Sequence, residues 1–249
     1  MQKKINNIHK LTIYQYKSGI IFSSPDQTFS IGFNSKNLES DFLNSISNFN
    51  INKIELIFFS SIPSIVPSKL FDEKLRSKYL ETNTSIKENI MHELSIDNKI
   101  AIVYSYDKQF INILNKKNIK YSISNYFTVL YNYLFEKDKI SDGISLYINL
   151  NEDSFDLLIF ISKEFIFYNS FDIKSKNEFL YYLLFVIKNY EISNKKDKVI
   201  FLGRYDKYLE YYEIANKYSI IEFIHDDSKK QYNSKSPFFS YLNEDNIRK

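Results

Sequence analysis

Cysteine and tryptophan are absent from this 249-residue chain, and only four glycines and four prolines occur. A chain without cysteine has neither disulfides nor thiolate metal ligands, which agrees with a cytoplasmic location. At the usual frequency of ~7%, about 17 glycines would be expected. Standard phosphate cradles need glycines so that backbone N–H groups can approach phosphate oxygens, and this chain has too few glycines to build them.

Histidine, arginine and long apolar runs are also scarce. His9, His92 and His225 lie far apart and none belongs to an H-x-x-x-H pair, so no metal site is predicted. Three of the 33 basic residues are arginines and the formal net charge is +3, which gives no reason to expect a nucleic acid as partner. The longest apolar run, 179–187, is far shorter than the ~20 residues that span a bilayer, so no membrane insertion is expected.

Apolar residues make up 44% of the chain and charged residues 25%, as in globular proteins, and the end from Asp226 is mostly polar. In the first half, β-rich runs predict a three-stranded meander, then a helix capped by Ser35, then a further strand. A helix at about 68–80 and another buried strand follow, and two more helical segments flank a short strand. The strands expected in this half are 11–16, 19–24, 27–33, 53–59 and 99–105.

The second half repeats this order of elements. Ser175 and Glu178 form an S-x-x-E capping box, which predicts a helix start, and a second helix is expected at 205–218. The strands expected in this half are 144–150, 154–161, 164–171, 198–203 and 219–224.

The order β-β-β-α-β-α-β is therefore predicted twice. Antiparallel strands followed by alternating helices and strands imply an α/β (mixed α+β) fold with helices on both faces of a mixed sheet. Two such units side by side describe the actin-like ATPase, ribonuclease H-like architecture. We expect a first half at 1–140 with a helical insertion around 62–98, a second half at 141–225, and a polar C-terminal segment at 226–249.

In this architecture, the turn between the first two strands of each half holds phosphate. An Asp at the end of the first strand holds hydrated magnesium, and glycines let the backbone approach the phosphate. The first half offers Gln15 in place of that Asp, and Gly19 is what any tight hairpin would use. In the second half the Asp and Gly positions fall at Asn149 and Asn151, and Asn tolerates a left-handed backbone.

Two carboxylates remain in the second hairpin. Asp153 and Asp156 could bind a metal or activate water, but we favour a turn residue and an outward strand residue. After the late strand, one glycine remains of the pair that seats adenosine, and the arginine after it would crowd or replace the base. If a nucleotide is bound, the residues expected to contact it are Asn149, Asn151, Asp153, Asp156, Gly203 and Arg204.

Four motifs point to a known family: S-I-P-S-I-V-P-S-K-L-F (61–71), F-Y-N-S-F (167–171), N-E-F-L-Y-Y-L-L-F (177–185) and V-I-F-L-G (199–203). Together they resemble the bacterial family named domain of unknown function 3822. The resemblance implies the actin-like fold and supplies no activity. The positions it marks are Val66, Pro67, Leu70, Phe71, Tyr168, Asn169, Ser170, Phe171, Tyr181 and Tyr182. We interpret them as structural: a helix entry packed on the sheet for the first group, and a strand end for the Asn-Ser pair.

These observations favour a catalytically inactive actin-like protein, a pseudo-ATPase that acts as a binding or scaffold module. Its partner would be an unknown protein or a second copy, docked in the cleft, and no cofactor is expected. The alternative is a nucleotide-binding protein or weak ATPase that uses ATP and magnesium with non-standard phosphate loops. A nuclease of the ribonuclease H type comes third, because the first strand, 11–16, carries no carboxylate for its metals.

Overall fold

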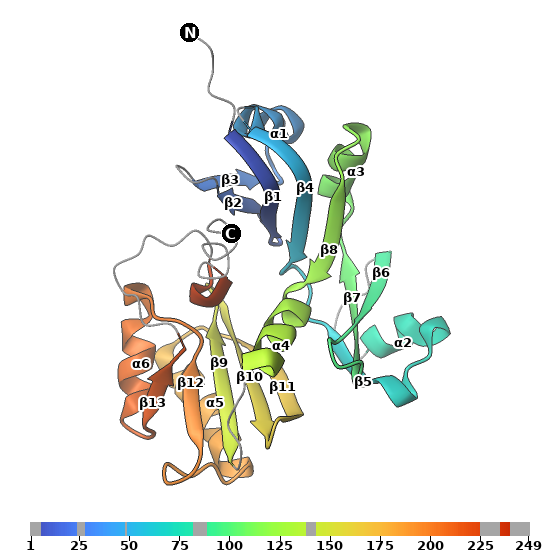
Figure 1. The fold of residues 1–249 in the computed structure, drawn as a ribbon. Coiled ribbons are helices and arrows are strands. Elements are labelled where there is room, and N and C mark those ends of the chain that lie inside the picture. Colours follow the sequence, from blue (N-terminus) through green and yellow to red (C-terminus); the bar gives the residue numbers. More distant parts are fainter. Residues whose placement is uncertain are drawn as a thin grey trace. The chain divides into compact units, whose positions relative to one another are not determined.

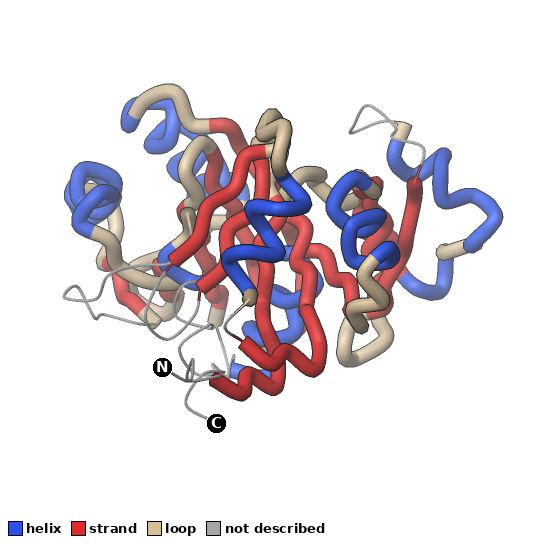
Figure 2. The backbone as a smooth tube through the Cα atoms, turned by 90° about the horizontal axis from the view of Figure 1, so that it is seen from above, coloured by secondary structure: helices blue, strands red, loops and turns tan. Residues whose placement is uncertain are grey.

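The computed structural model describes residues 6–23, 28–47, 49–81, 89–137, 143–224 and 235–239 (Figure 1). The chain divides into two compact units, Met1–Leu134 and Phe135–Lys249. Each unit contains a five-stranded mixed sheet. Helices lie beside these sheets (Figure 2, helices blue and strands red), which confirms the predicted α/β class.

The main sheet of the first unit has the strand order β3-β2-β1-β4-β8. The pairs β1–β2 and β2–β3 are antiparallel, whereas β4 runs parallel to both β1 and β8. Its elements are β1 (Asn6–Gln15), β2 (Gly19–Ser23), β3 (Thr28–Gly32), α1 (Leu38–Ile46), β4 (Phe49–Phe58), α3 (Gln109–Lys116), β8 (Tyr121–Asn125) and α4 (Tyr126–Lys137). Phe42 of α1 makes edge-to-face contacts with Phe22 of β2 and with Phe110 of α3, so α1 packs on both elements.

Between β4 and α3 the chain forms a second sheet with three strands, in the order β5-β7-β6. The elements of this insertion are β5 (Ser64–Pro67), the 3-10 turns η1 (Ser68–Leu70) and η2 (Glu73–Leu75), α2 (Arg76–Leu80), β6 (Asn89–Leu94) and β7 (Ile100–Tyr106). Val66, Leu80 and Val103 form its small core. The expectation of one helix over 68–80 is wrong, since only α2 is α-helical there. The strand predicted at 99–105 exists as β7 but belongs to this sheet, and β8 completes the main one.

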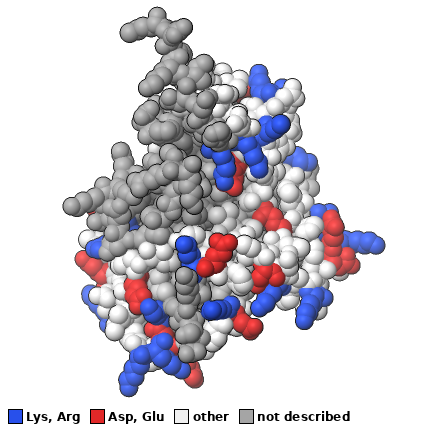
Figure 3. Space-filling view, in the orientation of Figure 1, with Lys and Arg blue, Asp and Glu red and all other residues white. Residues whose placement is uncertain are grey.

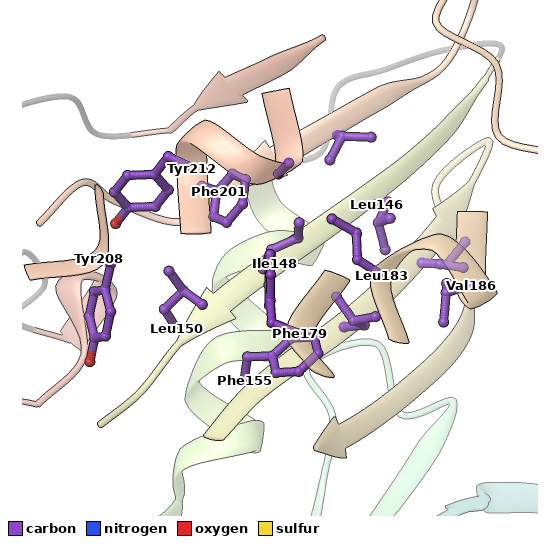
Figure 4. Close-up of a cluster of buried hydrophobic side chains, with 14 of the residues drawn as sticks. Leu146, Ile148, Leu150, Phe155, Phe179, Leu183, Val186, Phe201, Tyr208 and Tyr212 are labelled. Carbon is purple, nitrogen blue, oxygen red and sulfur yellow. The ribbon is translucent and has the colours of Figure 1, made fainter. Parts of the chain in front are cut away.

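The second unit has the strand order β11-β10-β9-β12-β13, with β12 parallel to both β9 and β13. Its elements are β9 (Ile144–Leu150), β10 (Ser154–Ile161), β11 (Glu164–Asp172), α5 (Lys176–Asn189), β12 (Lys198–Phe201), η3 (Asp206–Tyr208), α6 (Leu209–Asn216) and β13 (Ile221–Phe223). Both main sheets therefore have the same topology, which confirms the predicted repeat of element order. Side chains of α5 and α6 form one core with β9, β10 and β12, in which Phe179 contacts Phe155 and Phe201 contacts Tyr212 (Figure 4).

The two predicted helix caps have different outcomes. Ser175 caps α5 by accepting a hydrogen bond from the backbone N–H of Glu178 (3.2 Å), as predicted. Ser35 does not cap α1, because that helix begins at Leu38. Ser35 Oγ instead accepts from the backbone N–H of Asn37 and donates to Asp41 (2.8 Å), so it orders the turn before the helix.

In the part of the chain that the structure describes, no helix has both the length and the apolar character needed to cross a membrane. Basic and acidic side chains are interspersed over the face drawn in Figure 3, and neither sign forms a continuous field there. The surface in this view therefore offers no electrostatic footprint for a polyanion.

Candidate functional site

The second unit brings polar residues together at the carboxyl ends of two neighbouring parallel strands. Asn149 lies near the end of β9, and Gly203 follows β12. A backbone hydrogen bond from Leu202 to Ile148 (3.0 Å) extends the pairing of the two strands to this edge. Open α/β sheets bind ligands beyond the carboxyl ends of their strands, so this edge is the candidate site.

Asp156 is the centre of a buried hydrogen-bond network at this edge. It is fully buried on β10, and its Oδ2 accepts from the side-chain amides of Asn149 (2.8 Å) and Asn151 (3.1 Å). Its Oδ1 accepts from the hydroxyl of Tyr168 on β11 (3.3 Å). The prediction of an outward strand residue is wrong for Asp156. Its carboxylate holds the turn between β9 and β10 in place, and three donors already occupy it.

The two other candidates in this turn have different environments. Asn151 is buried, and its backbone N–H donates to Ser154 O (2.8 Å), which closes the hairpin. It is not among the residues with positive φ, so the turn does not use the left-handed backbone that an Asn would tolerate. Asp153 is exposed, and its carbonyl accepts from the backbone N–H of Ile173 (2.8 Å). The structure thus separates Asp153 from Asp156, one facing solvent and one buried.

The segment Lys235–Phe239 lies against this edge and ends in a short helical turn (Figure 1, red). Ser236, which is fully buried, donates its hydroxyl to Asn149 Oδ1 (2.9 Å). The carbonyl of Lys235 accepts from the hydroxyl of Tyr208 (3.0 Å). Phe238 and Phe239 are both fully buried. A piece of the chain itself therefore covers the carboxyl end of β9.

Gly203 makes the close approach of this segment possible. Its φ of +142° favours glycine, and a Cβ at this position would lie 2.8 Å from Pro237 Cβ. The loop around it is fixed by Tyr212, whose hydroxyl donates to Gly203 O (3.2 Å) and accepts from the backbone N–H of Tyr205 (3.0 Å). Arg204 is half-buried, and its guanidinium lies over the ring of Phe223 at 5.5 Å. The glycine predicted to seat a base thus contacts a proline of the same chain.

Charges flank the same segment. Lys235 forms an ion pair with Glu152 in the turn between β9 and β10, and Lys207 lies 3.8 Å from the same carboxylate. The hydrogen bond from Lys235 lowers the pKa of Glu152, burial opposes this effect, and the charges of Lys235 and Lys207 add to it. Glu152 therefore stays ionised and attracts a cation at the first residue of the docked segment.

The corresponding turn of the first unit has no carboxylate at the strand end. Gln15 is fully buried at the end of β1, and its amide donates to the carbonyl of Asp107 (3.5 Å). A Cβ on Gly19 would lie 2.2 Å from Ile31 O, so this glycine is needed for the close pairing of β2 with β3. Its constraint therefore comes from β3 and not from the turn between β1 and β2 for which a glycine was predicted, and Gly19 is not among the residues with positive φ.

Glu93 on β6 forms a second buried polar group in the first unit. It accepts hydrogen bonds from the hydroxyl of Tyr104 and from the backbone N–H of Asn125 (3.0 Å). Burial raises the pKa of Glu93, and these hydrogen bonds oppose the rise. Asn125 in turn caps α4 by accepting from the backbone N–H of Phe127 (2.9 Å). This network ties the inserted sheet to the end of β8.

The positions marked by the family resemblance lie in both units, and those of the first unit differ in their burial. Val66 lies in the core of the inserted sheet, as interpreted from the sequence, and Pro67 precedes η1. Leu70 is 73% exposed, so the expectation that it packs on the sheet is wrong: it belongs to a 3-10 turn that faces solvent. Phe71 packs on the ring of His92 (4.8 Å).

The remaining marked positions lie in the second unit. Asn169 Oδ1 accepts from the backbone N–H of Ser170 (3.0 Å), while β11 continues beyond both to Asp172. Phe171 stacks on Tyr182 (4.4 Å) and on Phe155 (5.2 Å). Tyr181, which is 62% exposed, contacts Tyr182 and Phe185 on α5. Among the marked positions, Tyr168 reaches the candidate site.

The sequence did not predict the residues of the segment that covers this edge, Lys235, Ser236 and Pro237, or the two residues that bind Lys235, Glu152 and Tyr208. One signal was available, since the apolar S-P-F-F run interrupts an otherwise polar end of the chain. Within the described ranges, no three His, Cys, Asp or Glu side chains gather in a way that could hold a metal ion. His9 and His225 lie outside the residues whose side chains are described.

Two solved structures show the same fold over nearly the whole chain. One is a protein of Bacteroides thetaiotaomicron VPI-5482 with an actin-like ATPase fold and unknown function, with a TM-score of 0.69, 20% identity, and coverage of 89% of this chain and 91% of that chain. The other is the PilM-PilN type IV pilus biogenesis complex, with a TM-score of 0.60, 10% identity, and coverage of 97% and 98%. No curated protein matches the sequence. These similarities show the actin-like ATPase fold.

The model of one protein family matches residues 11–220, which is most of the chain. The match includes the inserted sheet and both main sheets, except residues 6–10 of β1 and the edge strand β13. The chain therefore belongs to the family described as "Protein of unknown function (DUF3822)".

Proposed function

We propose that this protein is a catalytically inactive, actin-like binding module, a pseudo-ATPase that contacts a protein partner and does not turn over nucleotide. The observation that carries the proposal is the seating of Lys235–Phe239 on Asn149 and Gly203. These are the two positions at which the sequence predicts phosphate and base contacts in the second half. A protein segment thus contacts two of the residues that a bound nucleotide would be expected to contact, which supports the proposal.

The chemistry of the two turns supports the same conclusion. Magnesium-dependent phosphate binding needs a carboxylate that is free to order water around the metal. Gln15 is an amide, and the carboxylate of Asp156 already accepts from Asn149, Asn151 and Tyr168. In the described part of the chain, the exposed Asp153 belongs to no group of three or more His, Cys, Asp or Glu side chains that could hold a metal ion.

A protein partner suits the surface better than a polyanion. Basic and acidic groups are interspersed on the face shown in Figure 3, and the net charge is small. One solved structure of similar fold is a complex of two proteins, PilM and PilN. A partner protein or a second copy is therefore the class of ligand to seek first.

Thermal unfolding with and without millimolar ATP or ADP plus magnesium tests the proposal. A ligand at ~100 times its dissociation constant adds about 2.7 kcal/mol to the free energy of unfolding. Each kcal/mol shifts Tm by roughly 2 to 4 °C for a chain of this size. We expect no shift with either nucleotide.

A rise of several degrees would overturn the proposal, above all if Asp153→Ala removed it. That result would favour a nucleotide-binding protein with non-standard loops. Magnesium alone is the matched control, because a metal bound without nucleotide would raise Tm in both samples.

A further inference from the structure

The contacts of Lys235–Phe239 differ from one residue to the next, and each has a distinct chemical requirement. Glu152 faces a cation, Asn149 Oδ1 accepts from a hydroxyl, and the Tyr208 hydroxyl donates to a backbone carbonyl. Gly203 leaves room for a proline ring that any side chain there would displace. Two aromatic rings then become fully buried. Contacts of this kind select a sequence, whereas a merely apolar surface would accept many.

We propose that Asn149, Glu152, Gly203 and Tyr208 form a peptide-binding site that selects a basic-Ser-Pro-aromatic-aromatic segment, with Lys235–Phe239 as its resident ligand and a partner segment of the same chemistry as its competitor. The site deepens the proposed function, on which it rests, by naming the class of partner.

The site is preorganised by groups that do not touch the segment's side chains. Asp156 fixes the amide of Asn149, which leaves Asn149 Oδ1 directed at the hydroxyl of Ser236. Tyr212 holds the backbone on both sides of Arg204. A rigid site loses little conformational freedom on binding, so short segments can bind it with useful affinity.

The resident segment belongs to the same chain and therefore competes at an effective concentration of the order of mM. An added peptide must displace it, which weakens the apparent binding to the natural protein. Lys235→Glu places two like charges together at Glu152 and loosens the resident segment. Because Lys235 is partly exposed, this variant is expected to fold.

The test measures fluorescence anisotropy of a labelled Lys-Ser-Pro-Phe-Phe peptide with full-length protein. We expect saturable binding to the Lys235→Glu variant, about tenfold tighter than to the natural chain because the tethered competitor is weakened. Lys195→Glu, which makes the same change of charge at another exposed lysine of this unit, is the matched control and should bind like the natural chain.

A charge exchange makes the test specific to the site. In the background of Lys235→Ala, which leaves the resident segment no charge to pair with position 152, Glu152→Lys should weaken binding of the Lys-Ser-Pro-Phe-Phe peptide at least tenfold. A Glu-Ser-Pro-Phe-Phe peptide should recover affinity for the same variant. The peptide site would be overturned if the affinities of the two peptides did not depend on the charge at position 152. It would also be overturned if the Lys235→Glu variant showed no saturable binding. The experiment contains no nucleotide, so a nucleotide-induced rise in Tm would refute the proposed function independently of this result.

Discussion

Replacing Asp156 with alanine should destabilise the second unit strongly. The variant removes the acceptor of the amide groups of Asn149 and Asn151, which are both buried. A buried donor left without a partner costs about 1–3 kcal/mol, so two of them and the lost packing give about 3–5 kcal/mol. For a chain of this size, that corresponds to a fall in Tm of roughly 6 to 20 °C.

A conservative variant separates charge from hydrogen bonding. Asp156→Asn keeps an oxygen that can accept from both amides and turns its NH2 toward Tyr168, whose hydroxyl can accept. Only the charge-assisted part of the bonds is lost, and we expect a cost of about 1–2 kcal/mol.

Calorimetry of both variants, with Asp153→Ala as the matched control, measures these effects. The exposed carboxylate of Asp153 should be replaceable within about 0.5 kcal/mol. The reasoning fails if Asp153→Ala costs as much as Asp156→Ala, because the two residues would then act together as a metal or catalytic pair. It also fails if Asp156→Ala costs less than about 1 kcal/mol.

Three further predictions concern the rest of the fold. Burial raises the pKa of Glu93, so the natural protein should lose stability as pH rises from the ordinary pKa of 4.5 through the raised pKa of the folded state. Urea unfolding at several pH values should show this decrease in the free energy of unfolding for the natural protein and not for Glu93→Gln. The same decrease in both proteins would contradict the assignment to Glu93. Phe179→Ala should cost about 3–5 kcal/mol in thermal unfolding, because Phe179 is fully buried against Phe155 and Tyr211, and a cost below about 1 kcal/mol would show that this core is not as packed as described. Ser175→Ala should cost about 1 kcal/mol in urea unfolding, because it removes the cap of α5. Ser175→Asp should retain most of the stability of the natural protein, because aspartate also caps helices.

The repeated order of elements could be predicted because each strand and helix carries its own local signal. The run 154–161 and the S-x-x-E box before α5 indicate their structures without knowledge of the rest of the chain. The inserted sheet gave weaker signals. The strand β5 has four residues and includes Pro67, and β6 mixes polar and apolar residues without alternation.

The candidate site depended on contacts that no local pattern records. Asp156 appeared to face outward because strands are expected to bury one face, yet Phe155 through Phe160 are all buried. Ser236 lies 87 residues from Asn149 in the sequence, and its hydrogen bond follows only from the folded arrangement. The degraded turns were visible in the sequence, whereas the position of Lys235–Phe239 at the turn of the second unit was not.

Labelling of a single thiol tests most directly whether the chain occupies its own site. The natural chain has no cysteine, so Ser236→Cys introduces the one reactive thiol. Because Ser236 is fully buried, we predict that this thiol reacts on the order of 100-fold more slowly than that of Ser77→Cys, an exposed control, and that ATP with magnesium leaves its rate unchanged. Equal rates for the two variants, or a rate at position 236 that rises with ATP, would contradict a site filled by Lys235–Phe239.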